Sequence, residues 1–256
     1  MMRRMIGITT VLLALLVWLL LSLNHVIDAA RFPPPHEVWS QFIFVATQGY
    51  GNGLLHNHIL HSLGLVAKGF TVAVLIGVPL GMLMGYSRRA ETLINPIFLV
   101  LRPIPPLAWI PLAIVWLGLG DGAKIMVIVV AAFVPSVINS YTGVRTLSVP
   151  VIEAAAMLNA RGFSLLRHVL LPGSLPMIFT GLRLSLQASW TTLVAAELIG
   201  ALYGLGSVLN QAAQDINPAM ILVAMVSVGI IGAATTFLLS LAENYAMPWR
   251  MERAQS

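Results

Sequence analysis

The feature that most constrains this chain is a series of long apolar blocks separated by short polar, proline-rich or glycine-rich segments. A helix that crosses a bilayer needs about 20 apolar residues, because each residue adds about 1.5 Å. The blocks therefore predict an all-α polytopic membrane protein, with residues 1–256 forming a single transmembrane domain. We expect about six spans, at approximately 5–23, 62–86, 93–119, 124–142, 174–200 and 219–243.

The composition supports this interpretation. Apolar residues make up 58% of the chain and charged residues 9%, whereas an average soluble domain carries about 25% charged residues. Lipid must therefore cover much of the surface. The basic residues behind the net charge of +5 lie singly or in pairs between apolar blocks, so we predict no nucleic-acid binding. The chain has no cysteine, which excludes disulfides, thiolate metal sites and a cysteine nucleophile.

The first block has two interpretations. Arg3 and Arg4 precede an apolar run from Met5 to Leu23, as in a secretory signal. The run is longer than an ordinary signal core, and no small-x-small site follows it directly, residues 28–30 being the nearest approach. We favour an uncleaved first span.

The basic residues also predict the orientation, because cytoplasmic loops are enriched in Lys and Arg. If the N-terminus lies inside, both termini and the segment 143–173 are cytoplasmic. The residues then placed inside are Arg3, Arg4, Arg88, Arg89, Arg145, Arg161, Arg167, Arg250 and Arg253, and those outside are Arg31 and Lys124.

The sequence contains none of the hydrolase, metalloprotease or nucleotide-binding motifs that a membrane enzyme or ATPase would need. Segment 118–124 has the wrong spacing for a phosphate-binding loop. We therefore predict a non-catalytic chain that binds no cofactor. His56, His58 and His61 form a cluster that a metal can use, but no carboxylate or cysteine accompanies them. We favour interfacial histidines satisfied by water or headgroups, and no metal.

Glycines recur every four residues in the second block, at Gly77, Gly81 and Gly85, with Pro79 between them. Such a stripe lets another helix approach closely. Ordinary packing within the subunit is the favoured interpretation, and a helix that slides during transport is the alternative.

The segment from Glu153 to Gly162 predicts a short helix outside the membrane. Pro150 suits a first helical turn, and Glu153 complements the positive end of the helix dipole. Alanines 154–156 give high helix propensity with little bulk, and Gly162 can close the helix in a left-handed conformation. A helix with so small a surface is suited to insertion into a cleft on a partner.

This stretch resembles the Glu-Ala-Ala loop of bacterial ABC importer permeases, continuing to an aliphatic residue, Val169, and then to Leu171 and Pro172. Asn159 stands where that family usually has glycine, and asparagine tolerates left-handed geometry well. The resemblance implies that the loop contacts an ATPase subunit. The residues it assigns to that coupling are Glu153, Ala154, Ala155, Asn159, Gly162, Leu171 and Pro172.

Segments 102–112 and 190–206 bring the resemblance closest to the taurine/alkanesulfonate/nitrate permeases. It implies a type I ABC importer transmembrane domain (MetI-like) in the bacterial inner membrane. The expected partners are a second permease copy, two cytoplasmic ATPase subunits that hold ATP and Mg²⁺, and an external solute-binding protein. The expected cargo is a small anionic or zwitterionic solute such as taurine or another alkanesulfonate. Nitrate or another small organic anion, and a stand-alone secondary transporter, are the alternatives.

Polar residues within the spans are candidates for the solute path. Arg102 precedes three prolines, and it either lines the path or lies near the cytoplasmic headgroups. Glu197 either gates the outer mouth or pairs with a basic residue such as Lys124, while Arg183 is expected to snorkel to the cytoplasmic surface. Hydroxyls in the fifth span either line a wet path or bond to their own helix. The candidates are Arg102, Pro105, Trp109, Trp190, Thr191, Thr192 and Glu197.

Overall fold

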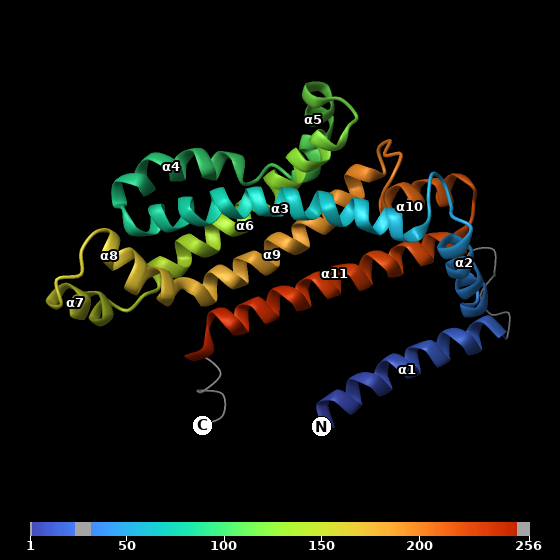
Figure 1. Cartoon of the computed structure of the whole chain (residues 1–256), viewed down its shortest axis with the longest axis horizontal. Helices are drawn as coiled ribbons and strands as arrows, with labels where there is room; N and C mark the ends of the chain where they lie inside the picture. The colour runs from blue at the N-terminus through green and yellow to red at the C-terminus, as the bar shows by residue number, and fades with distance from the viewer. Residues whose placement is uncertain (1, 24–31, 250–256) are drawn as a thin grey trace. The chain divides into compact units, whose positions relative to one another are not determined.

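The protein is described by a computed structural model that covers residues 2–23 and 32–249. These residues form helices joined by short connections (Figure 1). The chain divides into two compact units, the first made of residues 1–62 and 200–230 and the second of residues 63–199 and 231–256. The elements are α1 (Met2–Leu23), α2 (Pro35–Thr47), α3 (Leu55–Tyr86), α4 (Arg88–Leu101), η1 (Pro106–Trp109), α5 (Ile110–Leu117), α6 (Asp121–Arg145), α7 (Val149–Met157), α8 (Phe163–Leu165), η2 (Leu166–Leu170), α9 (Leu171–Glu197), α10 (Leu205–Gln214) and α11 (Pro218–Ala246).

Four helical stretches in the described ranges are long and apolar enough to cross a membrane. They match the predicted second, fourth, fifth and sixth spans, and they are Leu55–Tyr86, Asp121–Arg145, Phe163–Glu197 and Pro218–Ala246. Helix α1 coincides with the predicted first span, and its 22 residues are sufficient to cross. The stretch that matches the predicted fifth span starts at Phe163. Residues 146–162, which we call the α7 loop, are the part of the predicted segment 143–173 that lies between two of the long apolar stretches.

The predicted third span, 93–119, is not one continuous helix. Helix α4 ends at Leu101, and the chain resumes as η1 and α5 after a bend of 83°. Three prolines lie at this break, and proline lacks the N–H that a continuing helix needs. The pair is either a broken span or a re-entrant loop, and counting it gives up to five crossing segments among the residues searched.

The glycine stripe of α3 packs directly on α6 in the second unit. A Cβ on Gly77 would lie 2.9 Å from the Ser136 Cβ, and one on Gly85 would lie 2.7 Å from the Val144 Cβ. The closest approach is at Gly81, where a Cβ would lie 2.3 Å from the Val137 carbonyl oxygen. The packing interpretation of the stripe is therefore confirmed, and sliding of α3 stays a prediction.

Helix α6 packs on α9 through its other small residues. The Ser136 and Ser185 hydroxyls are 2.8 Å apart, and Ser185 also donates to the Ala132 carbonyl at 2.7 Å. A Cβ on Gly181 would meet the Asn139 Cβ at 2.6 Å. Small side chains on both faces thus place α6 in close contact with α3 and with α9.

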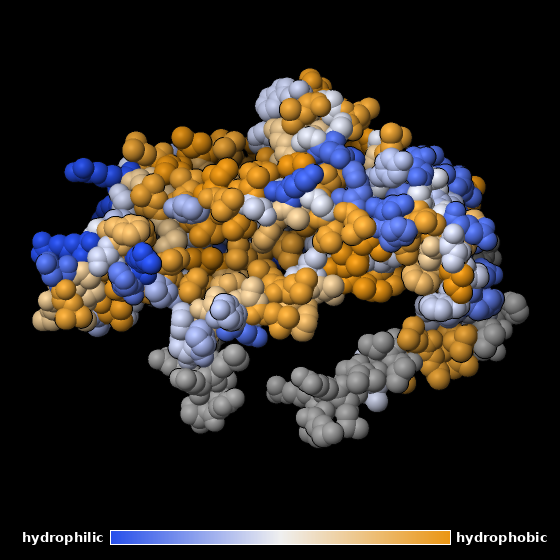
Figure 2. All heavy atoms as spheres, in the orientation of Figure 1, coloured by the Kyte–Doolittle hydropathy of each residue, from blue (hydrophilic) through white to orange (hydrophobic). Residues whose placement is uncertain are grey.

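Large apolar side chains on the second unit point outward, as expected for helices solvated by lipid. Figure 2 shows this apolar surface over α3 and α4. These side chains are not buried in a core, and an apolar surface this extended would be unfavourable in water. Examples of exposed residues on these helices are Leu75, Ile76, Leu93, Ile97 and Val100.

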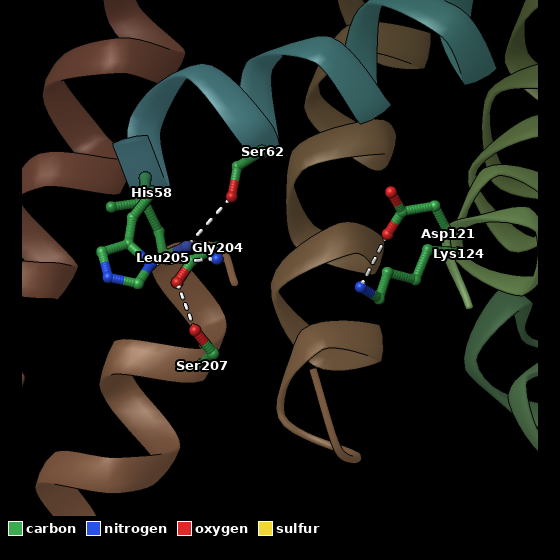
Figure 3. Close-up of polar contacts among 7 residues, drawn as sticks. All are labelled: His58, Ser62, Asp121, Lys124, Gly204, Leu205 and Ser207. Carbon is green, nitrogen blue, oxygen red and sulfur yellow. Dashed lines mark hydrogen bonds and ion pairs between the residues drawn. The ribbon is translucent and has the colours of Figure 1, made fainter. Parts of the chain in front are cut away.

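Within the first unit, two side chains of α3 cap the start of α10 (Figure 3). His58 Nδ1 accepts from the Gly204 N–H at 3.1 Å, and its Nε2 donates to the Tyr50 carbonyl at 3.1 Å. Ser62, one turn later, accepts from the Leu205 N–H at 2.9 Å. The prediction that the histidines are satisfied by water or headgroups is wrong for His58, which is buried and bonded to protein.

The same unit holds further contacts between distant segments. The Tyr50 hydroxyl donates to the Asp215 carboxylate, and burial together with this carboxylate raises the pKa of Tyr50 above its ordinary value. Asn52 donates to the Leu202 carbonyl at 2.9 Å. These contacts attach the segment before α3 to both ends of α10.

Only some of the charged residues used to predict the orientation lie among the described residues. Arg31, Arg250, Arg253 and the small-residue site at 28–30 lie outside the described residues. Lys124 is buried in the first turn of α6 and pairs with Asp121 at 3.0 Å (Figure 3). Glu91 of α4 contacts both Tyr141 and Arg145 of α6, the latter at 3.4 Å, so the start of α4 and the end of α6 lie together.

Candidate coupling loop and solute path

Helix α7 extends from the second unit beside α8 (Figure 1). It starts after Ser148, with Pro150 in the first turn as predicted, and it ends at Met157. Glu153 and Ala154 are exposed, whereas Ala155 is only 7% exposed. The three predicted coupling residues on α7 therefore do not share one surface, because Ala155 faces inward.

Asn159 closes helix α7. Its φ is +58°, and its N–H donates to the Ala156 carbonyl at 3.0 Å. The Ala160 N–H donates to the Ala155 carbonyl at 2.9 Å. This pair of bonds is a Schellman motif, which needs a left-handed residue at that position. The prediction that Gly162 closes the helix is wrong, since Gly162, with φ +57°, instead starts α8.

Three exposed apolar side chains flank this turn and were not predicted. Met157 is 89% exposed, Leu158 is 84% and Phe163 is 73%. Met157 and Leu158 lie in the short segment between two long apolar stretches, and Phe163 is the first residue of the second of these stretches. Their position in the sequence beside the predicted coupling helix could have indicated their role, because a helix with small side chains needs larger neighbouring side chains to bind a partner.

The base of the α7 loop is anchored in the core. Leu170, the last residue before Leu171 and Pro172, is buried with Met82 of α3, Val144 of α6 and Ile178 of α9. We call these four residues the loop-base cluster. Leu147 of the α7 loop, Leu165 of α8 and Leu166 of η2 also pack against it. The base of the loop is therefore packed against α3, α6 and α9.

The candidate path residues divide between two cavities. Arg102 and Trp109 line a cavity of about 530 Å³, whose other walls are mainly apolar residues of α4 and α6. Arg102 is exposed at the end of α4, and Trp109 Nε1 is buried without a hydrogen-bond partner in the described part of the chain. Pro105 caps η1 and does not line this cavity.

Trp190 and Thr191 line a second cavity of about 670 Å³ between α9 and the end of α11. Trp190 is buried and donates to the Thr235 hydroxyl at 3.1 Å. Thr192 and Glu197 are 4% and 0% exposed and lie away from both cavities. The seven candidates therefore do not form one site.

An ion pair at this second cavity was not predicted. Arg183, expected to snorkel, pairs with Glu243 of α11, whose side chain is 7% exposed. The sequence signal was present, because Glu243 is an acid in the last turns of an otherwise apolar helix. No group of three or more His, Asp or Glu side chains within residues 2–23 and 32–249 is arranged to hold a metal ion.

Comparison with known proteins places these features in a family. The sequence pattern of the binding-protein-dependent transport system inner membrane component matches residues 77–249, which include the α7 loop, the lining of the second cavity and all of the first cavity's lining except Ile76. The chain belongs to this family. Its helices are those of an ABC importer permease, and the predicted all-α, type I importer membrane fold is confirmed.

Two relatives show how far the similarity extends. The taurine transport system permease protein TauC of Escherichia coli is 35% identical over 248 residues, covering 96% of this chain and 90% of TauC. The bicarbonate transport system permease protein CmpB of Synechococcus elongatus is 33% identical over 227 residues, covering 85% of this chain and 80% of CmpB. The resemblance to the taurine/alkanesulfonate/nitrate permeases is confirmed.

The fold has a solved counterpart. A chain of the MetNI methionine ABC transporter in an inward facing conformation aligns with a TM-score of 0.63, covering 75% of this permease and 95% of that chain at 21% identity. At this identity the likeness concerns the fold alone.

Proposed function

We propose that this permease moves a small anionic or zwitterionic solute, taurine or another alkanesulfonate, into the cytoplasm through the bacterial inner membrane. The 35% identity to TauC over nearly the whole chain carries the choice of cargo. The similarity to CmpB favours a second candidate, a small anion such as nitrate or bicarbonate.

In this proposal the chain itself is non-catalytic and binds no cofactor. Two permease copies associate with two cytoplasmic ATPase subunits, which hold ATP and Mg²⁺, and with an external solute-binding protein. The basic residues support cytoplasmic termini and a cytoplasmic α7 loop. Arg88 and Arg89 start α4, Arg145 ends α6, and the contacts of Glu91 hold these ends together beside the loop.

The α7 loop is the proposed contact with the ATPase. Glu153, Ala154, Met157 and Leu158 offer an exposed surface on a short helix that the Asn159 turn holds in place. Closure of the ATPase pair would move this helix, and the loop-base cluster would pass the displacement to α3, α6 and α9. Packed helices with two stable arrangements convert such a shift into opening on the opposite side.

The solute-path residues remain part of the proposal. The second cavity supports Trp190 and Thr191, and the first supports Arg102 and Trp109. Burial of Thr192 and Glu197 favours roles inside the subunit.

The substitution Glu153→Lys tests the coupling role. It reverses a charge on an exposed residue, so the permease should insert in normal amount while solute-stimulated ATP hydrolysis falls at least about tenfold in reconstituted vesicles. The matched control is Glu37→Lys, which reverses an exposed charge in the first turn of α2 outside the loop. Normal stimulated hydrolysis in the Glu153→Lys complex would remove the α7 loop from the coupling mechanism.

A further inference from the structure

The second cavity has mainly apolar walls, but two helices each contribute regularly spaced polar side chains to it. On α9 the lining includes Arg183, Gln187 and Thr191, spaced four residues apart and so on one helix face. On α11 it includes Thr236 and Ser240 with the same spacing. We call this cavity the α9–α11 groove. Hydrocarbon offers the Arg183 guanidinium and the Gln187 amide no partners.

One end of the groove carries hydrogen-bond donors. Glu243 forms an ion pair with one guanidinium nitrogen of Arg183, Nη2, but the Arg183 side chain remains 44% exposed. A guanidinium presents five N–H donors in a fixed fork that suits a sulfonate or carboxylate. Gln187, one turn further along α9, adds an exposed amide. Glu243 holds the fork in place and leaves part of it facing the groove.

The other end carries acceptors. The Thr191 hydroxyl donates to the Gln187 and Ala188 carbonyls at 3.1 Å, and the Thr236 hydroxyl donates to the Gly232 carbonyl at 2.8 Å. Because each hydroxyl proton is used within its own helix, the oxygen lone pairs are what these residues offer to the groove. Buried Trp190 closes this end and presents an aromatic ring.

We propose that the α9–α11 groove binds a small zwitterion, with its acidic group at Arg183 and Gln187 and its ammonium group toward the Thr191 and Thr236 oxygens. Four residues of helix separate successive polar groups by about 6 Å, a gap that a short amino acid or amino sulfonate can bridge with a hydrogen bond at each end. The groove volume of about 670 Å³ leaves room for such a solute and water. This proposal rests on the proposed transport function and adds a cargo-contact site to it.

The test measures ATP-driven uptake of labelled taurine by vesicles that contain the permease, its ATPase and its solute-binding protein. Gln187→Leu removes the donor end without touching the Arg183 ion pair, and Thr236→Val removes an acceptor with almost no change of shape. Each should lower the rate of taurine uptake about 3- to 10-fold, the effect of losing one hydrogen bond. Basal ATP hydrolysis and the amount of assembled complex should not change.

Thr180→Val is the matched control. Thr180 is also exposed on α9 and also donates to its own helix, at 2.9 Å to the Pro176 carbonyl, but it does not line the groove. Uptake by this variant should equal that of the wild type. Wild-type uptake in both groove variants, a loss in only one of them, or an equal loss in Thr180→Val would overturn the two-ended site.

The Arg183 end has its own test. Replacing Arg183 alone would remove the cation that pairs with the buried Glu243 carboxylate, and breaking a buried ion pair destabilises proteins strongly. The double variant Arg183→Met with Glu243→Gln keeps the pair neutral, and its taurine uptake should fall more than that of either single groove variant. Retention of full uptake would remove the guanidinium from the site. A wild-type complex that moves no taurine contradicts the proposed cargo itself, which distinguishes that failure from a failure of the groove.

Discussion

The substitution Gly81→Ala tests the close packing of α3 on α6. A Cβ at this position would lie 2.3 Å from the Val137 carbonyl oxygen and 2.9 Å from the Ser140 Cβ. Real Cβ atoms essentially never approach another heavy atom within 3.0 Å, so the two helices must separate there by at least 0.7 Å (3.0 − 2.3). Backbone is the obstacle at the shorter distance, and no rotamer change relieves it.

The expected cost follows from a matched control in the same helix. Gly64 has no atom within 4 Å of its ideal Cβ, so Gly64→Ala gains the helix propensity of alanine without a clash. Gly81→Ala gains the same propensity, which cancels in the comparison. The difference between the two variants is then the overpacking term, about 1–3 kcal/mol. For a chain of this size about 1 kcal/mol corresponds to a shift of about 2–4 °C in Tm.

The assay is thermal unfolding of the two purified variants in the same mild detergent, with helical circular dichroism as the signal. Gly81→Ala should unfold below the wild type, and Gly64→Ala at the same temperature or above it. Equal Tm values for the two variants would refute the close α3–α6 contact, and with it the explanation of the glycine stripe.

Three further predictions concern the turn after α7 and the contacts around α10. Asn159→Gly should leave stimulated ATP hydrolysis unchanged, whereas Asn159→Val, which tolerates positive φ poorly, should reduce it severalfold without loss of expression. His58→Phe should lower the free energy of unfolding by about 1–3 kcal/mol for each polar group it leaves unpaired, at Gly204 and at Tyr50, measurable by denaturant titration in detergent. Because the pKa of Tyr50 is raised, its phenol should keep its proton above pH 10, where an ordinary tyrosine ionises, and the Asp215 contact should stabilise the fold fully below that pH and be lost only as pH rises further. Phenolate absorbance compared with that of Tyr50→Phe checks this, and a normal Tyr50 titration would show that the contact is absent.

The helices were predictable from the sequence where length and apolarity decide. The approximate positions of α3, α6, α9 and α11 follow from blocks that must cross about 30 Å of hydrocarbon, although α3 starts at Leu55, seven residues before the predicted span. The prolines after Arg102 explain why the predicted third span is broken. The glycine stripe was readable because its spacing matches the helical period. These features depend on local sequence alone.

The remaining features depend on pairings that local sequence does not determine. His58 and Gly204 are 146 residues apart, so the cap of α10 appears only when the unit is folded. Asn159 and Gly162 both tolerate left-handed geometry, and only the hydrogen bonds behind Asn159 decide which one ends α7. Arg183 meets Glu243 because of the register between α9 and α11, which tertiary packing sets.

The most direct test of the proposed function is uptake of labelled taurine by vesicles that contain this permease, its ATPase partner and its solute-binding protein. We predict uptake when ATP is supplied to the ATPase subunits. We predict none with a non-hydrolysable ATP analogue, and none when the ATPase or the solute-binding protein is omitted. Taurine uptake by the permease alone, or uptake indifferent to ATP, would contradict the claim that this chain is the membrane subunit of an ATP-driven importer.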